Sequence, residues 1–579
     1  MLGGGLGYKL TLLCERLDIS SLVLIEPDSD LFYASLHAND WAALLEHLHQ
    51  HNCAFNLLIG QSPEQLFTDM HLFYQRHGLF LPSCRLIVHG YHSPELTALE
   101  QALERDYQRH YNAVGFFDDV AFGAAHALSH LKAGTPFLRA GRHLSAGLQN
   151  VPCAVVGNGP SLDFDLPWLR RHQEHIVICA CGTAIESLYR AGIAPDFYCV
   201  TERLPQIADL IAATCPDESF RANVTLLATD VVHPRVTALF PSRALFLKPA
   251  EMLFAYARKL WPQDLPALLD FANPLVGNTG LSAMLALGFK ELYLFGLDCG
   301  VSADAKKTHS AQAQYYNFGE NTRKANALSG LGEQCEGNFG GRCCSSPLYA
   351  MCARLLELAL ASHPEIRCFN CSRGRRIAGA SALESALIKI PESRAPKQEL
   401  QQEVRTRLSA PLTEGCTRFQ SCLENLPWRD TLARLDEILK GACQSQSRPA
   451  CTDAMIRAHE LSVRSGALHF LFGGTLQSLF IQAQTALYQD PDEKSALLKA
   501  HGILTLSRYF LEDAGKVVLP HLKEYVMGEQ RRFLGSQVGL DHAGCPAPNL
   551  PAPELDTFAT DIKAFKAHHR PEPFVKRYD

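Results

Sequence analysis

The stretch of residues 154–163, with the sequence AVVGNGPSLD, predicts the fold of the middle of this chain. The apolar run Cys153–Val156 is typical of a buried strand in a parallel sheet. Glycines and a proline then end the strand in a loop, where Gly157 and Gly159 allow positive φ angles and let a ligand lie against the backbone. Ser161 stands where its side chain would cap the following helix. A strand, a glycine loop and a helix in this order predict an α/β fold with an anion site at the helix start.

A glycine loop alone is a weak indication of phosphate binding, and a plain tight turn is the alternative. A second element favours the binding site. Asn278 and Thr279 precede a small, apolar run at residues 281–288, so we expect them at a helix N-terminus, where the dipole favours negative charge. A buried strand follows and ends in glycine and Asp298. Together the two helix starts predict a site for a nucleotide with an extended charged group, although Thr279 as a simple N-cap stays an alternative.

These motifs resemble two known families. GNGPSL at residues 157–162, with NTG at residues 278–280 and LALGFKELYLFGLD at residues 285–298, resembles bacterial sialyltransferases that use CMP-activated sugars. The resemblance is closer to the motility-associated factor (Maf) proteins, flagellin glycosyltransferases whose central domain shares that core. Further segments that look like the Maf pattern are IEPD at 25–28, CGTA at 181–184, GIAPDFY at 192–198, GNFGG at 337–341 and FNCS at 369–372.

Composition is that of an ordinary globular protein. A chain of 579 residues predicts three or four domains, and 47% hydrophobic with 20% charged residues is typical of packed cores. A net charge of −6 without a basic tract argues against a nucleic-acid partner. Because no apolar run is long enough to span a membrane and no signal peptide leads the chain, we expect a cytoplasmic protein.

We expect an α/β protein of three domains: a Rossmann-like domain at 1–132, a sialyltransferase-like domain at 133–390 and a helical domain at 391–579 with a proline-rich tail at 545–554. The helical domain would either dock a protein partner or brace the fold. In the first domain, apolar runs at 22–25, 55–59 and 86–88 alternate with helical stretches.

The glycine stretch at residues 3–8 usually follows a strand, and none precedes it here. We therefore expect the first domain to lack its first strand, and whether the true N-terminus is missing stays open. Glu26 follows these glycines as the acid does in dinucleotide and methyl-donor folds, which would imply a second nucleotide site. Without a further catalytic feature, the sequence favours a vestigial Rossmann-like domain.

The 20 cysteines lie scattered in apolar segments, as is typical of reduced, buried thiols. Cys368 and Cys371 have the spacing of half a zinc site, but the FNCS motif accounts for them as a strand end. We expect no bound metal.

The resemblance implies a donor site and a base in the central domain. Its donor loop corresponds to Gly157, Asn158, Gly159 and Ser161, and its second motif, which would reach the phosphate or the donor carboxylate, corresponds to Asn278, Thr279 and Gly280. Thr201 follows a predicted strand, at a position where related enzymes often offer an asparagine side chain to the nucleotide. Both Thr201 and Gly182 depart from this asparagine pattern. Asp298 would bind a ribose hydroxyl or cap a turn.

For the general base, His309 in a polar loop is the first choice, because imidazole titrates near neutral pH. Sialyltransferases of this type use a histidine base, although the flanking sequence differs. A surface histidine is the alternative. Tyr315 or Tyr316 would donate to the leaving phosphate, and Glu202 is the second choice of base.

The resemblance thus implies a cytoplasmic, inverting glycosyltransferase that moves a pseudaminic- or legionaminic-type nonulosonic acid from its CMP conjugate to Ser or Thr of flagellin. It implies no tightly bound cofactor. Assistance by Mg²⁺ or Mn²⁺ and an oligomeric state stay open. Two alternatives remain: a pyrophosphokinase of hydroxymethylpterin, and a flagellin-binding protein without catalysis.

Overall fold

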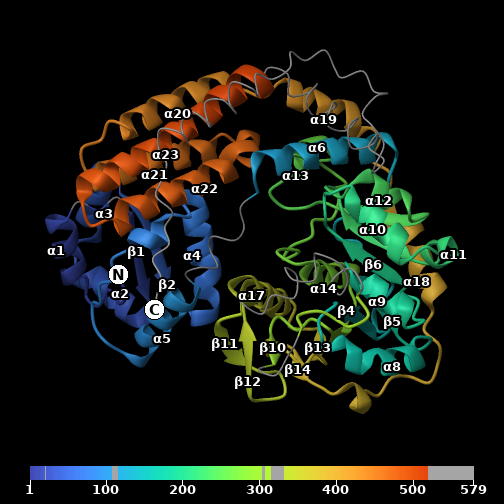
Figure 1. Ribbon diagram of the computed structural model, residues 1–579. Coiled ribbons are helices and arrows are strands. Elements are labelled where there is room, and N and C mark those ends of the chain that lie inside the picture. The colour runs from blue at the N-terminus through green and yellow to red at the C-terminus, as the bar shows by residue number, and fades with distance from the viewer. Residues whose placement is uncertain are drawn as a thin grey trace, which may run out of the picture.

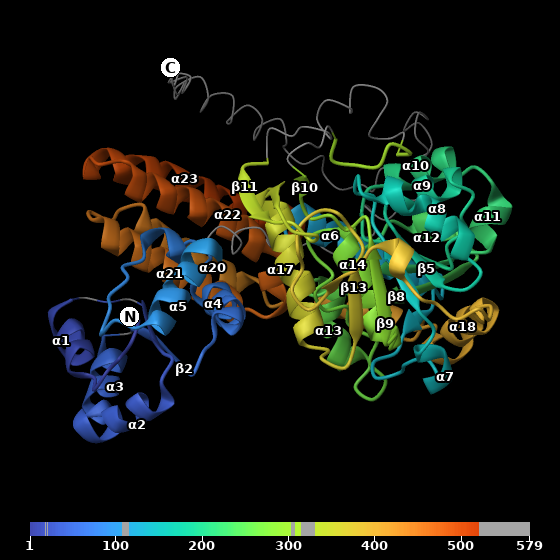
Figure 2. The same ribbon diagram turned by 90° about the horizontal axis from the view of Figure 1, so that it is seen from below.

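The computed structural model describes residues 1–519 except 18, 20, 52, 107–114, 303–306 and 314–330 (Figure 1). The predicted proline-rich tail therefore lies outside the described residues. In Figures 1 and 2 a small N-terminal α/β part and a row of long helices stand beside a larger α/β part. Among the described helices, none is long and apolar enough to cross a membrane.

The larger part is built on a ten-stranded sheet of order β14-β13-β9-β4-β5-β6-β7-β8-β3-β15. All neighbouring strands pair in parallel except β15 with β3. The central strands are apolar and buried on both faces, as the run at β4 predicts. The strands are β3 Phe137–Leu138, β4 Cys153–Val156, β5 Val177–Cys181, β6 Phe197–Val200, β7 Thr225–Thr229, β8 Ser242–Phe246, β9 Glu291–Phe295, β13 Arg367–Asn370, β14 Ser381–Ala382 and β15 Ser409–Ala410.

The order of the strands reverses at β4. From β4 the chain builds outward through β5 to β8, and it then returns to place β9 on the other side of β4. Ligands of open α/β sheets bind at such a reversal, beyond the carboxyl ends of the strands. The fold therefore points to the loops after β4 and β9.

Helices cover both faces of this sheet (Figure 2). They are α6 Phe117–Lys132, α7 Ala146–Gln149, α8 Leu162–His172, α9 Ala184–Arg190, α10 Gln206–Thr214, α11 Glu218–Ala222, α12 Pro234–Ala238, α13 Met252–Leu260, α14 Val276–Leu287, α17 Pro347–Ala361, the 3-10 turn η4 Ser385–Leu387, α18 Lys397–Glu403 and the π turn η5 Val404–Leu408. A small antiparallel sheet joins β10 Val301–Ser302, β12 Arg342–Ser345 and β11 Glu333–Glu336.

The N-terminal part pairs β1 Ser21–Glu26 in parallel with β2 Ala54–Ile59. Leu2 forms parallel bridges with both Ile25 and His89, so a one-residue stub stands where the missing first strand was expected. The predicted strand at 86–88 is wrong: this run forms no strand, and the bridge to Leu2 is made by His89, which follows it. Around these strands lie α1 Tyr8–Arg16, α2 Ser29–Ala38, α3 Trp41–Gln50, α4 Pro63–His77, η1 Leu81–Cys84 and α5 Pro94–Asp106.

Glu26, at the end of β1, is fully buried and turned to the glycine stretch. One carboxylate oxygen, Oε2, accepts hydrogen bonds from the N–H groups of Gly4 (2.8 Å) and Gly5 (3.3 Å). The other, Oε1, accepts from the Tyr91 hydroxyl (2.5 Å) and the Asp28 N–H (3.1 Å). The carboxylate thus ties the glycine stretch to the end of β1.

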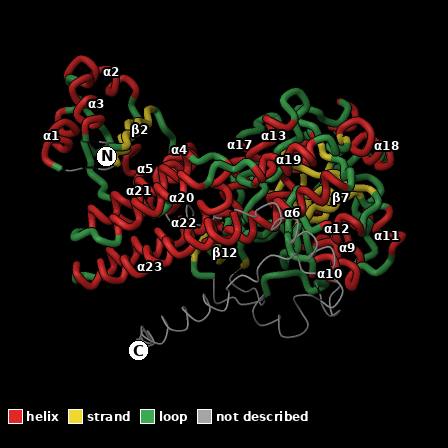
Figure 3. Tube along the Cα trace, turned by 90° about the horizontal axis from the view of Figure 1, so that it is seen from above, coloured by secondary structure: helices red, strands yellow, loops and turns green. Residues whose placement is uncertain are grey.

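The C-terminal region is helical, and its long helices lie side by side (Figure 3), above the N-terminal part in the view of Figure 1. Helix α22 also packs against α6 and α13, so the row connects the two α/β parts. A left-handed Gly466 splits the predicted run 454–488 into two helices. The elements are α19 Gly415–Glu424, α20 Arg429–Ala442, α21 Arg448–Arg464, α22 Ala467–Gln489, α23 Glu493–Asp513 and the π turn η6 Ala514–Val518.

The predicted fold class, α/β with a helical C-terminal region, is confirmed. The large sheet also takes in β15, beyond the position near residue 390 where the sequence suggested a boundary.

Candidate functional site

The loop after β4 packs directly on the loop after β9. Gly157 N–H donates to the Phe295 carbonyl (2.8 Å) and Gly159 N–H to the Gly296 carbonyl (2.9 Å). A Cβ on Gly157 would lie 2.6 Å from the Gly296 oxygen, and one on Gly159 only 2.0 Å from an Asp298 carboxylate oxygen. Neither Gly157 nor Gly159 takes the positive φ angle that glycine allows, since neither is among the left-handed residues. Glycine is required here because the two loops approach closely.

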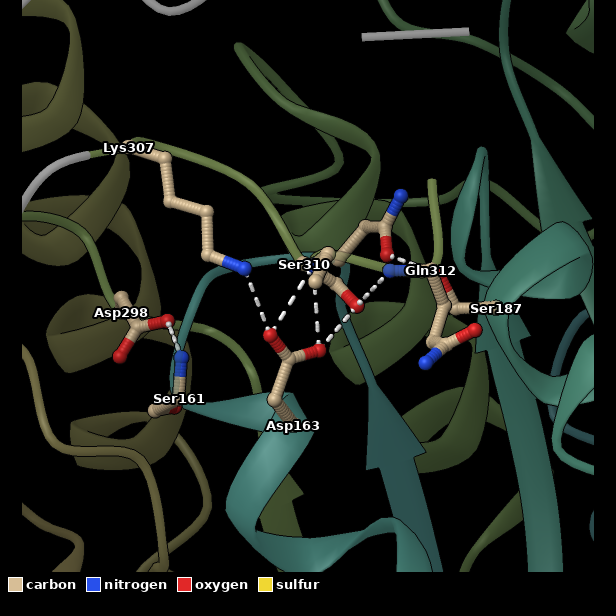
Figure 4. A network of polar contacts seen from close by, with 9 residues as sticks. Ser161, Asp163, Ser187, Asp298, Lys307, Ser310 and Gln312 are labelled. Atoms are coloured by element: carbon tan, nitrogen blue, oxygen red, sulfur yellow. Dashed lines mark hydrogen bonds and ion pairs between the residues drawn. The ribbon is translucent and has the colours of Figure 1, made fainter. Parts of the chain in front are cut away.

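Asp298 lies beneath this loop, and its Oδ2 accepts a hydrogen bond from the Ser161 N–H at 3.1 Å (Figure 4). Burial raises the pKa of the Asp298 carboxyl to about 6, and the hydrogen bonds from Ser161 lower it by less. Ser161 takes the predicted N-cap position of α8, but its side chain makes no capping hydrogen bond. With the N–H groups of Gly157, Gly159 and Ser161 used inside the protein, little of the loop's main chain remains to bind an anion.

Replacing Asp298 with asparagine is expected to flatten the pH dependence of stability. The folded protein keeps this proton up to about pH 6, whereas the carboxyl has an ordinary pKa of 3.8. Because the folded state binds more protons between pH 4 and 6, the aspartate's contribution to the free energy of unfolding falls as pH rises through that window. Between pH 4 and 7, the free energy of unfolding of Asp298→Asn should therefore rise by about 2 kcal/mol relative to that of the parent, as measured by urea unfolding. A difference that does not change with pH would contradict this assignment.

Asn158 connects the loop to the next helix. Its Nδ2 donates to Thr183 Oγ1 (2.9 Å), and its Oδ1 accepts from the Ser187 hydroxyl (2.7 Å). Thr183 is the N-cap residue of α9, and Asn158 is 9% exposed. The Asn158 side chain therefore holds the ends of β4 and β5 in a fixed relation.

Residues 307–313 form a segment over the loop, and Asp163 in the first turn of α8 holds it (Figure 4). Its carboxylate accepts from Lys307 Nζ (2.8 Å), the Ser310 hydroxyl and the Ala311 N–H (2.9 Å). Ser310 N–H also donates to the Asn158 carbonyl (2.9 Å). These bonds place the neighbouring His309 at the reversal point of the sheet.

His309 itself is half-buried, and its Nδ1 lies 3.0 Å from the Thr308 hydroxyl oxygen. Glu202, the second choice of base, is exposed after β6, and Thr201 beside it is half-buried. Tyr315 and Tyr316 lie outside the described residues. Of the two described candidates for the base, His309 and Glu202, His309 lies in the segment that bonds directly to the glycine loop, through Ser310 and Asn158.

The second motif lies inside α14, which begins at Val276, earlier than expected. Asn278 is fully buried: its Nδ2 donates to the Cys352 carbonyl (3.0 Å) and its Oδ1 accepts from the Cys352 thiol (2.7 Å). Thr279 donates to the Ala272 carbonyl (2.9 Å). A Cβ on Gly280 would meet Cys181 Sγ at 2.2 Å. All three residues thus have packing roles, and their assignment to the donor stays a prediction.

The start of α14 still reaches the same edge of the sheet. A Cβ on Gly277 would lie 3.2 Å from the Leu297 side chain, in the loop after β9. Gly182 after β5 is left-handed (φ 54°), and a Cβ there would meet Val276 at 2.7 Å. The N-terminal turn of α14 therefore lies between the ends of β5 and β9.

The sequence interpretation missed the residues that hold this site together: Asp163, Thr183, Ser187, Lys307 and Ser310. For Asp163, the acidic first turn of α8 was a signal that the sequence offered. No local pattern connects Asp163 with its partners Lys307 and Ser310, because they lie far along the chain.

Among the described residues, no group of three or more His, Cys, Asp or Glu side chains is placed to hold a metal ion. The described cysteines are free thiols, and burial raises the pKa of the Cys368 thiol to about 12. The Cys368 thiol is therefore protonated at neutral pH.

The geometry can be set beside known proteins. Residues 1–112 match the glycosyltransferase Maf N-terminal domain, and residues 129–304 match the 6-hydroxymethylpterin diphosphokinase MptE-like family. The structure of the Maf glycosyltransferase from Magnetospirillum magneticum AMB-1 is similar, with a TM-score of 0.62 and 24% identity over 93% of this chain and 82% of that one. No curated protein sequence matches. The chain thus resembles the Maf glycosyltransferases in its N-terminal domain and has the fold of one of them, in line with the resemblance of the motifs.

Proposed function

We propose that this protein is an inverting glycosyltransferase that moves a nonulosonic acid of the pseudaminic or legionaminic type from its CMP conjugate to serine or threonine hydroxyls of flagellin. The proposal places it in the cytoplasm and in flagellar assembly and motility. The Maf N-terminal domain and the fold of a Maf glycosyltransferase support the enzyme class. The sugar, the acceptor and the inverting stereochemistry rest on the resemblance of the motifs.

One observation carries the proposal. Where the sheet order reverses, the glycine loop, Asp298 and the segment with His309 are bonded to one another through Ser161 and Ser310. A glycine loop for the donor and a titratable group for the acceptor are thereby brought to one edge of the sheet. This is the arrangement that transfer from a nucleotide sugar to a hydroxyl requires.

In this proposal the cytidine lies along the ends of β4 to β6, near Asn158, Ser161 and Thr201. The first turn of α14 faces the leaving phosphate, because its aligned amides favour the charge that grows there as the glycosidic bond breaks. Asn278, Thr279 and Gly280 keep that turn in place through their contacts with α17, residue 272 and β5. Asp298 fixes the loop and, while protonated, offers a hydrogen bond to a ribose hydroxyl.

His309 takes the proton from the attacking acceptor hydroxyl in this mechanism. Asp163 is the positioning residue, since it bonds the segment on both sides of the histidine, at Lys307 and Ser310. Glu202 is the alternative base, and Tyr315 is the proposed donor to the phosphate. We propose no tightly bound cofactor, with Mg²⁺ or Mn²⁺ as an assisting ion.

Thermal melting with nucleotides tests the donor site. A CMP concentration about 100-fold above the Kd should stabilise the protein by about 2.7 kcal/mol, whereas NAD should not. Asn158→Ala should lower the melting temperature without ligand, because two buried hydrogen bonds are lost, and should abolish the CMP shift. Ser187→Ala is the matched control: it removes one of the two bonds yet leaves the Asn158 side chain in place, and the CMP shift should persist.

A second candidate function is pyrophosphate transfer from ATP to hydroxymethylpterin, because the MptE-like match covers 129–304. A melting shift with ATP alone would favour it. Flagellin binding without a shift from any nucleotide would instead indicate a binding protein and contradict both enzymes.

A further inference from the structure

The small antiparallel sheet that precedes α17 carries two cysteines that the proposed transferase reaction does not use (Figure 1). In this sheet β11 and β12 form a hairpin, and Cys335 lies directly opposite Cys343 in their register. Side chains of directly opposite residues project from the same face of a sheet. Their Cα atoms are ~4.5–5.5 Å apart, within the ~4.4–6.8 Å that a disulfide bond spans. The backbone therefore suits a bond between these two cysteines, the hairpin pair.

The sulfur atoms of the hairpin pair already lie close together. Cys335 Sγ is 2.8 Å from Cys343 Sγ. Since a disulfide bond is ~2.05 Å long, the two atoms need to approach by less than about 1 Å. Two other described pairs of thiols have sulfur atoms 3.5 Å apart: Cys179 with Cys199, and Cys299 with Cys352. All four of those thiols are buried, so they are closed to a reagent from solution.

One thiol of the hairpin pair is open to solvent. Cys335 is half-buried, whereas Cys343 is 2% exposed. The hydrogen bond with Cys335, and then burial, raises the pKa of the Cys343 thiol. Because reaction requires an accessible thiolate, a reagent from solution would meet Cys335 first. Cys343 is then placed to react with whatever Cys335 has bound.

The hairpin is bound to the loops of the candidate site. Asn338, in the turn between β11 and β12, donates from Nδ2 to the carbonyls of Asn370 and Ser372, both at 2.8 Å. From the same loop after β13, Arg375 N–H donates to the Asp298 carbonyl (2.7 Å). A covalent bond across the hairpin would therefore stiffen the support of the loop after β9.

We propose that Cys335 and Cys343 form an oxidation site, at which a small disulfide such as glutathione disulfide converts the two thiols into a disulfide bond across the hairpin. First, the Cys335 thiolate attacks one sulfur of the small disulfide, which forms a mixed disulfide and releases one small thiolate. Next, Cys343 loses its proton and attacks the Cys335 sulfur, which releases the second small thiolate. The protein gives up two electrons and two protons, and the two released thiolates take up the protons. An excess of small thiol reverses the exchange.

Incubation of the full chain with glutathione disulfide, followed by alkylation of the remaining thiols and peptide mass spectrometry, tests the proposal. Trypsin cleaves after Arg342, between the two cysteines, so a bond between them appears as two linked peptides. The parent should lose both thiols to this link, and dithiothreitol should restore them. Cys343→Ser should stop at the first step and keep one glutathione on Cys335. Cys344→Ser is the matched control and should form the same link as the parent.

Amide hydrogen exchange gives a second measurement. Exchange in the turn at residues 337–341 should slow when the parent is oxidised, and it should not slow in Cys343→Ser. Two results would overturn the proposal: a parent that keeps glutathione on Cys335 without forming the link, or a link that Cys344→Ser abolishes. Formation of a link at a buried pair of thiols before the hairpin pair reacts would overturn it as well.

Discussion

Replacing His309 with asparagine is expected to lower the rate of sugar transfer to flagellin by about 10²- to 10⁴-fold, the usual contribution of a general base. Asparagine keeps the size and polarity of the side chain but cannot accept a proton near neutral pH. Transfer from the CMP-linked nonulosonic acid is measured by the mass of the modified flagellin. The melting shift with CMP should stay at the parent value, because the histidine acts on the acceptor.

Two results would contradict this role. An equal loss of CMP binding in His309→Asn would indicate a structural histidine, and full activity would exclude it as the base. Glu202→Gln is the control, because it removes the exposed alternative base. This variant should keep the parent's rate of sugar transfer. The parent's rate should rise with pH as the base loses its proton, and this limb should vanish in His309→Asn.

Replacing Gly159 with alanine is expected to remove CMP binding and to destabilise the protein by about 1–3 kcal/mol. The new Cβ would lie 2.0 Å from Asp298 Oδ2 and 2.8 Å from the Gly296 carbonyl, so the two loops would have to separate. The separation breaks the contact that places the donor loop over Asp298. Urea unfolding and the CMP melting shift measure the two effects.

Gly147→Ala is the control for this substitution, because nothing lies within 4 Å of a Cβ there and its φ is not left-handed. It should leave both stability and CMP binding near the parent values. The double variant Gly159→Ala with Asp298→Ala should recover part of the stability, since it removes the nearest clashing oxygen. A Gly159→Ala protein with parent stability would show that the loops are not closely packed.

Local patterns were enough to predict the strands and the loop at which the site forms. The apolar run Cys153–Val156 and the glycines after it were interpreted correctly as a buried strand and a turn. The close contact that requires these glycines could not be predicted, because their neighbours Gly296 and Asp298 follow another strand, which only the folded sheet brings near.

The same limit applies to the second motif. Asn278 and Thr279 looked like free ligands at a helix start, yet Asn278 is satisfied by Cys352 and Thr279 by Ala272. The bond between Asp163 and Ser310 likewise spans 147 positions of the chain. Single-sequence patterns indicate which residues are polar, but they do not show which partner each one meets.

In the N-terminal part, the buried carboxylate of Glu26 binds to the glycine stretch as a covalently attached anion would. It occupies the amides of Gly4 and Gly5 as an internal anion, and its effective concentration is set by the fold rather than by the solution. A free dinucleotide or methyl donor would have to displace this carboxylate and leave a buried charge with fewer partners. These internal hydrogen bonds favour a structural role for the glycine stretch, which is to hold the start of the chain against the end of β1.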